Sequence, residues 1–226
     1  MLSNENDITC WVSIFSGKIK SDNQYALNDF GRKCILITID QILTYIECFN
    51  ITKLDESNRV LERKDINLFD SVCLREALLN AFIHNDWVDL NAQMISIFED
   101  RIEILSYGGL PSKLTKVGFL AGKSKPRCIE LAEIFLQLRI SERSGRGVPK
   151  IIGKYGKESI KIEKNRIIVT IPFNKINVNS FEIVDKKVDK KVYQKLNKSQ
   201  VIIITAIRNN LNITVNQLMI ESNLSE

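Results

Sequence analysis

Apolar residues recur every three or four positions in four stretches of the chain, which is the spacing that places them on one face of a helix. The predicted helices run over Gly31–Asn50, Ser71–His84, Arg127–Leu138 and Val148–Tyr155. Pro149 falls in the first turn of the last helix, where a proline is tolerated. Each of these helices therefore has an apolar face to bury.

Shorter stretches rich in apolar residues predict strands. They lie at Cys10–Phe15, Gln93–Phe98, Arg101–Leu105, Lys157–Lys164 and Arg166–Phe173. Only Glu99 and Asp100 separate the second and third, so these two should form a hairpin. The fourth and fifth should form another hairpin around Asn165. Asp65–Asp70 is expected to be a short connector.

Four regions are predicted along the chain. They are a lead-in packed with the core (1–66), the core itself (67–175), a basic linker (176–198) and a partial winged helix-turn-helix (199–226). In the last region Thr214 precedes Gln217 by three residues, which is typical of a capping box at a helix start. Asn223–Ser225 is similar to the turn before a recognition helix, which would follow the last residue given.

Composition excludes several protein classes. With 44% hydrophobic and 26% charged residues, the composition argues against a fully disordered or collagen-like chain. No apolar run reaches the roughly 20 residues of a membrane span, and the polar N-terminus has no secretory signal. The five cysteines form no CxxC pair, which argues against a zinc knuckle or a disulfide framework. We therefore expect a cytoplasmic protein with reduced thiols.

The net charge of +5 hides a strong asymmetry. Residues 1–110 contain 10 basic and 17 acidic side chains, whereas residues 111–157 contain 11 basic and 3 acidic ones. Cations gathered in one segment raise the local affinity for polyanions, so this segment is a candidate phosphate-binding region. A solvated basic face is the other interpretation.

Three polar residues of the second predicted helix, Glu76, Asn80 and His84, are spaced by four and so share one face. A glutamate can accept a proton from water or orient the water molecule. An asparagine offers a neutral oxygen of the kind that Mg²⁺ accepts. The stripe therefore suits nucleotide chemistry, although an ordinary exposed stripe with a satisfied histidine is the alternative.

Two glycine loops are candidates for close contact with a ligand. Gly108-Gly109 follows a predicted strand, and glycine lets the backbone approach a ligand. Gly145-Arg146-Gly147 precedes a helix N-terminus, where free N–H groups favour an anion. Both could instead be simple tight turns. No Walker A or Gly-x-Gly-x-x-Gly sequence occurs, so a bound phosphate would require another fold.

The order of these segments resembles the RecG-like C-terminal ATPase-type domain, over about residues 10–175. The segments that carry the resemblance are Arg75–Trp87, Asp100–Ile104, Gly108–Pro111 and Glu142–Val148. Such domains occur in bacterial transcriptional regulators, between a Schlafen/AlbA-like DNA-binding domain and a winged helix. The family is similar to the GHKL (Bergerat-fold) group. The resemblance implies an α+β fold in which a layer of helices covers one face of a mixed sheet.

The resemblance also implies roles for individual residues, with ATP and Mg²⁺ as cofactors. Glu76 would activate water, and Asn80 would hold Mg²⁺ through the nucleotide. His84 and Asp86 are further nucleotide-binding candidates. Gly108 and Gly109 would lie beside adenine, Gly145 and Gly147 would form the phosphate lid, and Arg146 and Lys150 would lie near the phosphates. We expect the acid, the carboxamide and both glycine loops to converge on one cleft.

Three positions depart from the pattern of the family. Ser106-Tyr107 stands where the group has the aspartate that binds the adenine amino group. Asn85 replaces the arginine of the usual His-Arg-Asp-Tyr, and Cys128 replaces an asparagine. A serine brings no charge to that place, so the pattern for adenine recognition is incomplete.

Three functional hypotheses follow. The first is a homodimeric, nucleotide-responsive regulator whose ends bind DNA. The second is a degenerate dimerisation scaffold that binds no nucleotide, and the third is a slow ATPase. Residues 186–198 contain six lysines and one aspartate, and Lys186, Lys187, Lys190 and Lys191 are the candidates for contact with DNA phosphates. A solvated linker is the alternative for this stretch.

Overall fold

A six-stranded sheet forms the centre of the fold. The computed structural model describes residues 1–3, 6–55, 64–142 and 144–174. The strands are β1 (Trp11–Phe15), β2 (Gln24–Asp29), β5 (Met94–Ile97), β6 (Arg101–Tyr107), β7 (Ile160–Ile162) and β8 (Arg166–Pro172), in the order β2-β1-β5-β6-β8-β7. β1 and β5 are parallel, and the other neighbouring pairs are antiparallel. The sheet is therefore mixed, as predicted.

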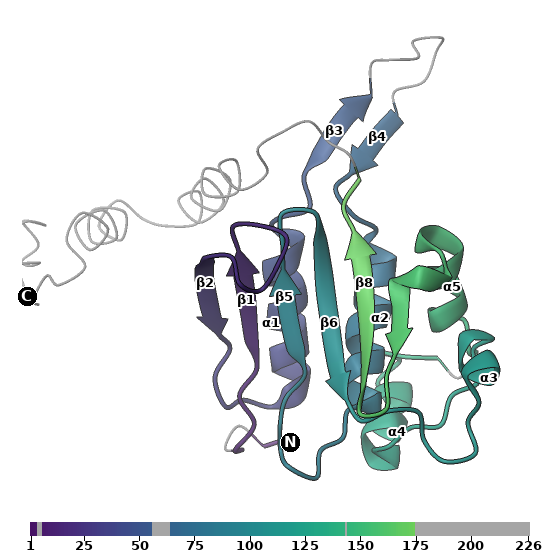
Figure 1. Cartoon of the computed structure of the whole chain (residues 1–226). Coiled ribbons are helices and arrows are strands. Elements are labelled where there is room, and N and C mark those ends of the chain that lie inside the picture. Colours follow the sequence, from purple (N-terminus) through teal and green to yellow (C-terminus); the bar gives the residue numbers. More distant parts are fainter. Residues whose placement is uncertain (4–5, 56–63, 143, 175–226) are drawn as a thin grey trace, which may run out of the picture. The chain divides into compact units, whose positions relative to one another are not determined.

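Helices cover one face of this sheet (Figure 1). They are α1 (Ile35–Glu47), α2 (Ser71–His84), α3 (Lys116–Leu120), α4 (Ile129–Gln137) and α5 (Gly147–Tyr155), followed by a 3₁₀ turn at Lys157–Ser159. In the part of the chain that the structure describes, the opposite face of the sheet has no covering helix. The arrangement confirms the predicted α+β sandwich.

Helix α2 lies at the centre of the core. It contacts α1, α4, α5 and the strands β6 and β8, so apolar residues are needed almost all round it. Leu74, Leu78 and Phe82 are fully buried. The sheet residues Ile95 and Ile104 are buried in the same core. Packing in the core therefore accounts for the apolar residues of α2 but not for its polar stripe of Glu76, Asn80 and His84.

Several predicted elements are confirmed. The bounds of α2 agree with the prediction, and β1, β5, α4 and α5 differ from it by a few residues. β6 continues two residues further, to Tyr107, because Tyr107 still pairs with Arg166 of β8. The predicted hairpin around Asn165 is present with a much shorter first strand, since Lys157–Ser159 forms the 3₁₀ turn.

Other elements differ from the prediction. Asp65–Asp70 is not simply a connector, because its first residues belong to β4 (Lys64–Asn67), which pairs with β3 (Thr52–Asp55). β2 was not predicted, and neither was α3, a helix of only five residues. These segments are short and depend on partners elsewhere in the chain, so the local pattern is weak.

The chain divides into two units, Met1–Val178 and Asn179–Glu226, and the fold described above belongs to the first. The predicted linker 176–198, the four candidate lysines within it and the helix-turn-helix at 199–226 lie outside the described residues. Among the described helices, none combines the length and the apolar character needed to cross a bilayer.

Candidate functional site: a cavity between α2, α4 and α5

A cavity of about 430 Å³ opens between α2, the α3–α4 segment and the start of α5. This volume is within the range of about 300–1,000 Å³ that is usual for small-molecule sites. Its charged lining residues are Glu76, Lys123, Glu133, Glu142, Arg146 and Lys150. Leu79, Ile83 and Phe119 are among its apolar lining residues, so the cavity combines an apolar wall with charged groups of both signs.

The polar stripe of α2 forms one side of this cavity. Glu76, Asn80 and His84 all line it, as their spacing of four predicts. Helix α2 begins where Asp70 accepts a hydrogen bond from the backbone N–H of Cys73 at 2.9 Å, which caps the helix. The cap sets where the helix starts and hence the direction in which the stripe faces.

The start of α5 lies directly against this stripe. A Cβ atom added at Gly147 would lie 2.5 Å from Oε2 of Glu76 and 3.0 Å from Nδ2 of Asn80. One turn later in α5, Nζ of Lys150 lies 3.9 Å from Oε1 of Glu76. Glycine at 147 therefore permits an approach that a side chain would obstruct, and it places the carboxylate beside a helix start and a cation.

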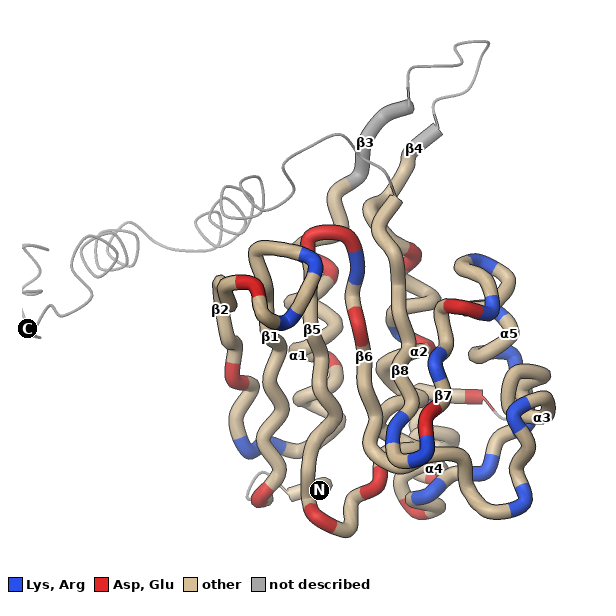
Figure 2. Tube along the Cα trace, viewed as in Figure 1, with Lys and Arg blue, Asp and Glu red and all other residues tan. Residues whose placement is uncertain are grey.

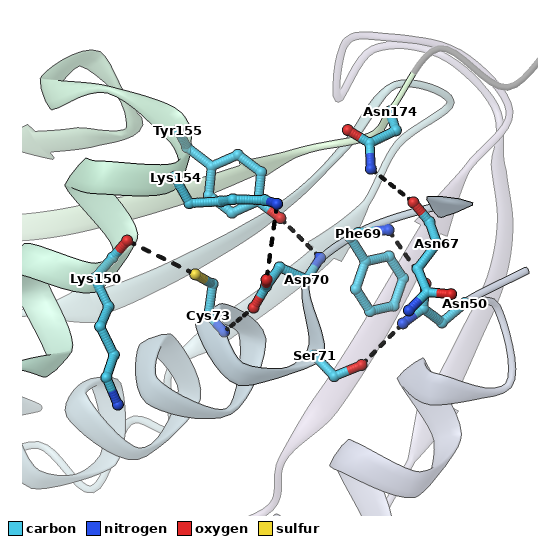
Figure 3. A network of polar contacts seen from close by, with 10 residues as sticks. All are labelled: Asn50, Asn67, Phe69, Asp70, Ser71, Cys73, Lys150, Lys154, Tyr155 and Asn174. Carbon is cyan, nitrogen blue, oxygen red and sulfur yellow. Dashed lines mark hydrogen bonds and ion pairs between the residues drawn. The ribbon is translucent and has the colours of Figure 1, made fainter. Parts of the chain in front are cut away.

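A network of polar contacts fastens the other end of α5 to α2 (Figure 3). The hydroxyl of Tyr155 accepts a hydrogen bond from the backbone N–H of Asp70 at 2.8 Å, and Nζ of Lys154 lies 4.0 Å from Oδ2 of the same residue. The thiol of Cys73 donates to the carbonyl of Lys150 at 3.9 Å. Burial raises the pKa of Tyr155 to about 12, so the phenol stays neutral. These contacts define the position of α5 over the cavity.

Two glycines close the cavity on the side of the loops. Gly122 and Gly145 both have positive φ, +89° and +64°. A Cβ atom at Gly122 would collide with the carbonyl oxygen of Gly145, and one at Gly145 would lie 2.6 Å from the carbonyl oxygen of Gly122. The backbone after α3 therefore packs directly on the loop before α5, and we call this contact the glycine clasp.

The loop Gly108-Gly109 does not line this cavity. Gly108 donates its N–H to the carbonyl of Asn165 at 2.7 Å, and a Cβ at Gly109 would collide with the carbonyl oxygen of Lys164. Arg127 packs on Gly108 and donates to the carbonyl of Gly109 at 2.9 Å. Both glycines therefore contact the β7–β8 turn. Of the two glycine loops that were expected to converge on the cavity, Gly145-Arg146-Gly147 lines it and Gly108-Gly109 does not.

Asp86 also lies away from the cavity lining. Its carboxylate pairs with Arg127 at 3.3 Å, and its backbone N–H donates to the carbonyl of Tyr107. Next to it, Asn85 is fully buried and accepts from the N–H of Tyr107 at 2.9 Å. The asparagine in place of the family's arginine therefore serves to join the end of α2 to β6.

Ser106, at the position of the expected aspartate, is 5% exposed. Its hydroxyl donates to the carbonyl of Ile167 across the sheet at 3.5 Å. It lines a second, much smaller void of about 20 Å³ between α2 and the sheet. This void borders the main cavity at Asn80, His84, Phe119 and Val148, which line both. A purine ring does not fit into a space of this size.

His84 is held neutral in the cavity wall. Its Nε2 lies 3.1 Å from Oγ of Ser124. The pKa of His84 falls from 6.5 to about 4, chiefly because burial disfavours the charged ring and also because Arg127 repels it, while a hydrogen bond with the backbone of Lys125 acts in the opposite direction. At neutral pH the ring therefore adds a polar group to the site but no charge.

The shifted pKa of His84 predicts a loss of stability as the pH falls from about 6.5 toward 4. In this window the unfolded chain binds a proton at the histidine and the folded chain does not, whereas above it neither state does. Urea unfolding at about pH 7, 5.5 and 4.5 should give a steeper decline for the wild type than for His84→Gln. The chain has one histidine, so its ring can also be titrated by NMR. A midpoint near 6.5 in the folded protein would contradict the assignment.

The basic segment seen in the sequence surrounds this site. Figure 2 shows lysines and arginines gathered around α3 and α5. Lys123, Arg146 and Lys150 face the cavity, where they are matched by Glu76, Glu133 and Glu142. Sequence analysis missed the last two of these carboxylates, since no spacing relates Glu133 on α4 or Glu142 in a loop to the stripe of α2. Local charge at the cavity is therefore more balanced than the segment as a whole.

The residues present fit a magnesium nucleotide in part. Glu76 and Asn80 offer oxygen atoms that Mg²⁺ accepts, and Arg146 and Lys150 offer positive charge for phosphate groups. Within the described ranges, no three His, Cys, Asp or Glu side chains gather as a metal site. If a magnesium nucleotide bound here, Glu76 and Asn80 are the residues of the α2 stripe that could offer oxygen atoms to the metal.

Comparison with known proteins gives one family and a similar fold. Residues 91–172 match the family described as "Putative ATP-dependent DNA helicase recG C-terminal". The matched segment contains Gly145–Gly147 and Lys150 but begins after α2. The crystal structure of the DIP2311 protein from Corynebacterium diphtheriae has a similar fold, with a TM-score of 0.63 at 18% identity over 97% of this chain. The chain spans 45% of that protein. No curated protein matches the sequence.

Proposed function

We propose that this chain, which carries a RecG C-terminal-like ATPase-type domain, binds ATP with Mg²⁺ in the cavity between α2, α4 and α5. Binding of the nucleotide would in turn control the binding of DNA by the ends of the protein. The observation that carries the proposal is the contact of Gly147 with Glu76 and Asn80. It brings a helix start, a carboxylate and a carboxamide to one cavity from segments some seventy residues apart. Such a combination suits a phosphate chain and its metal ion.

The chain's own residues would act in distinct ways. Arg146 and Lys150 would bind phosphate oxygens, and the N–H groups at the start of α5 would add to that attraction. The apolar wall of Leu79, Ile83 and Phe119 would exclude water from part of the ligand. Lys150 is 3.9 Å from Glu76, so a phosphate group near the lysine would compete for this ion pair.

Regulation would depend on the loops that border the cavity. The glycine clasp joins the loop after α3 to the loop before α5, and Gly147 joins the start of α5 to α2. A ligand bound between these segments would stabilise their contacts. DNA binding through the basic residues 186–198 is the inferred output. The basic residues 186–198 and the resemblance to regulators support this part.

Calorimetric titration with ATP and Mg²⁺ tests the ligand. We expect saturable binding to the wild type and at least roughly tenfold weaker binding to Asn80→Ala, because the metal loses its link to the protein. Asn91→Ala is the matched control, since this asparagine lies in the loop after α2 and outside the cavity lining. No heat of binding up to about millimolar nucleotide would overturn the proposal.

The scaffold hypothesis keeps one specific observation in its favour. Ser106 replaces the aspartate, its hydroxyl is already bonded, and the adjoining void holds about 20 Å³. A chain that binds no nucleotide but still associates with itself would fit this hypothesis.

The third hypothesis, a slow ATPase, is tested with Glu76→Gln. If the variant releases phosphate from ATP at the same rate as the wild type, Glu76 is excluded as the base that activates water.

A further inference from the structure

Helices α2 and α4 lie antiparallel beside the cavity and are joined near both ends. The backbone N–H of Cys128, which precedes α4, donates to the carbonyl of Ile83 at 3.5 Å. At the other end the guanidinium of Arg75 donates to the carbonyl of Ile140, shortly after α4. Because the two pairs fix the helices in opposite directions, Glu133 in the middle of α4 lies level with the middle of α2.

The cavity wall formed by these two helices is largely aliphatic. Its aliphatic residues are Leu79 and Ile83 of α2 and Ile129, Ala132 and Leu136 of α4. Ile129 is a large apolar residue, and yet it is 59% exposed where it lines the cavity. Aliphatic side chains on both sides of a space suit a flat ring, because each face of the ring can contact one of them. We call this part of the cavity the α2–α4 slot.

Glu133 lies on the same face of α4 as the aliphatic residues of the slot. Among the residues that the structure describes, its carboxylate has no hydrogen bond and no ion pair. The other two carboxylates of the cavity do have partners. Glu76 pairs with Lys150 at 3.9 Å, and Glu142 accepts a hydrogen bond from a neighbouring serine hydroxyl at 3.3 Å. Glu133 can therefore accept hydrogen bonds from a ligand without losing an existing contact.

The charges of the cavity give a bound nucleotide a direction. Arg146 and Lys150 lie at the start of α5, so a phosphate chain is attracted to that side and the base is directed toward α4. The space beside Ser106 holds about 20 Å³, and Gly108-Gly109 packs on the β7–β8 turn. Neither of these two places accommodates a base, whereas the α2–α4 slot belongs to the cavity of about 430 Å³.

We propose that the base of the nucleotide lies in the α2–α4 slot and that Glu133 accepts a hydrogen bond from its exocyclic amino group. This inference rests on the proposed function, because it assigns the base to a part of the same cavity. A carboxylate accepts hydrogen bonds and donates none, so Glu133 favours a base with an amino group at this edge over one without it. Glu133 in this way supplies the charged acceptor that is absent at Ser106.

Calorimetric titration with ATP and with purine riboside triphosphate, both with Mg²⁺, tests the role of Glu133. The analogue has the same ring system without the amino group, so the wild type should bind ATP at least roughly tenfold more tightly. Glu133→Ala should weaken the binding of ATP to the level of the analogue and leave the analogue unaffected. Glu130→Ala is the matched control, since Glu130 belongs to the same helix but does not line the cavity.

The outcomes of this titration separate the inference from the proposed function. If the wild type binds neither nucleotide, both are overturned. If the wild type binds the two nucleotides equally, or if Glu133→Ala retains the preference for ATP, the role of Glu133 is wrong while nucleotide binding stands. Thermal unfolding of each variant verifies that it folds.

Ile129→Ser tests the position of the base. Removal of this aliphatic side chain should weaken both nucleotides at least roughly threefold, because the ring loses apolar contact on the α4 side. Binding of inorganic triphosphate should not change, since it reaches only the cations at the start of α5. Undiminished binding of the nucleotides, or equal weakening of all three ligands, would show that the base does not lie in the α2–α4 slot.

Discussion

Gly109→Ala is expected to lower the free energy of unfolding by about 3 kcal/mol. The added methyl group would collide with the carbonyl oxygen of Lys164 and lie 2.9 Å from that of Glu163. Both atoms belong to the backbone of the β7–β8 turn, so no side-chain rotation can relieve the collision. The turn would have to move away from β6, which also weakens the hydrogen bond from Gly108 to Asn165.

Urea unfolding of Gly109→Ala measures this loss, and Gly153→Ala is the matched control. Gly153 lies within α5, and apart from its chain neighbours and the backbone of its own helix no atom lies within 4 Å of its Cβ position. The same substitution there should raise stability by about 0.5–1 kcal/mol through helix propensity. A neutral effect of Gly109→Ala would mean that the turn does not pack against this loop, and would return Gly108 and Gly109 to the list of candidate ligand contacts.

Gly122→Ala is expected to open the glycine clasp and to cost about 2 kcal/mol or more of stability. The methyl group would meet the carbonyl oxygen of Gly145, and φ of +89° is unfavourable for alanine. Because the clasp joins the two loops that border the cavity, ATP binding should weaken at least roughly tenfold as well. Unfolding curves and calorimetry with ATP and Mg²⁺ measure the two effects.

A double-variant cycle gives this prediction a sharper form. Gly145→Ala breaks the same contact from the other side, so the losses of stability for the single variants should not add in Gly122→Ala/Gly145→Ala. Additive losses would show that the two glycines act independently and that the clasp is not a single contact. If stability falls but ATP affinity is unchanged, the clasp supports the fold without shaping the ligand site.

The location of the site follows from two separate kinds of contact. The capped helix α2 presents Glu76 and Asn80, and the polar network around Asp70 and Tyr155 positions α5 over them. The first contact is within one helix, and the second joins residues 85 positions apart. Changes to this network, such as Tyr155→Phe, should therefore alter the cavity without touching any residue that lines it.

The sequence by itself determined the helix α2, its polar stripe and the hairpin of β5 and β6. A repeat of 3.6 residues places Glu76, Asn80 and His84 on one face whatever surrounds the helix, and a two-residue turn leaves the hairpin few alternatives. The charge asymmetry was also visible, and Lys123, Arg146 and Lys150 from the basic segment do line the cavity. These are local properties, decided by spacing along the chain.

Only the tertiary structure decided which glycine loop meets that stripe. Gly108-Gly109 and Gly145-Arg146-Gly147 look alike as sequences, but β6 pairs with β8 and so directs the first loop to the turn at Lys164 and Asn165. The second loop reaches Glu76 because α5 packs on α2. Strand register and helix packing bring together residues that are far apart in the chain. The sequence around each glycine therefore does not predict which residues that glycine will contact.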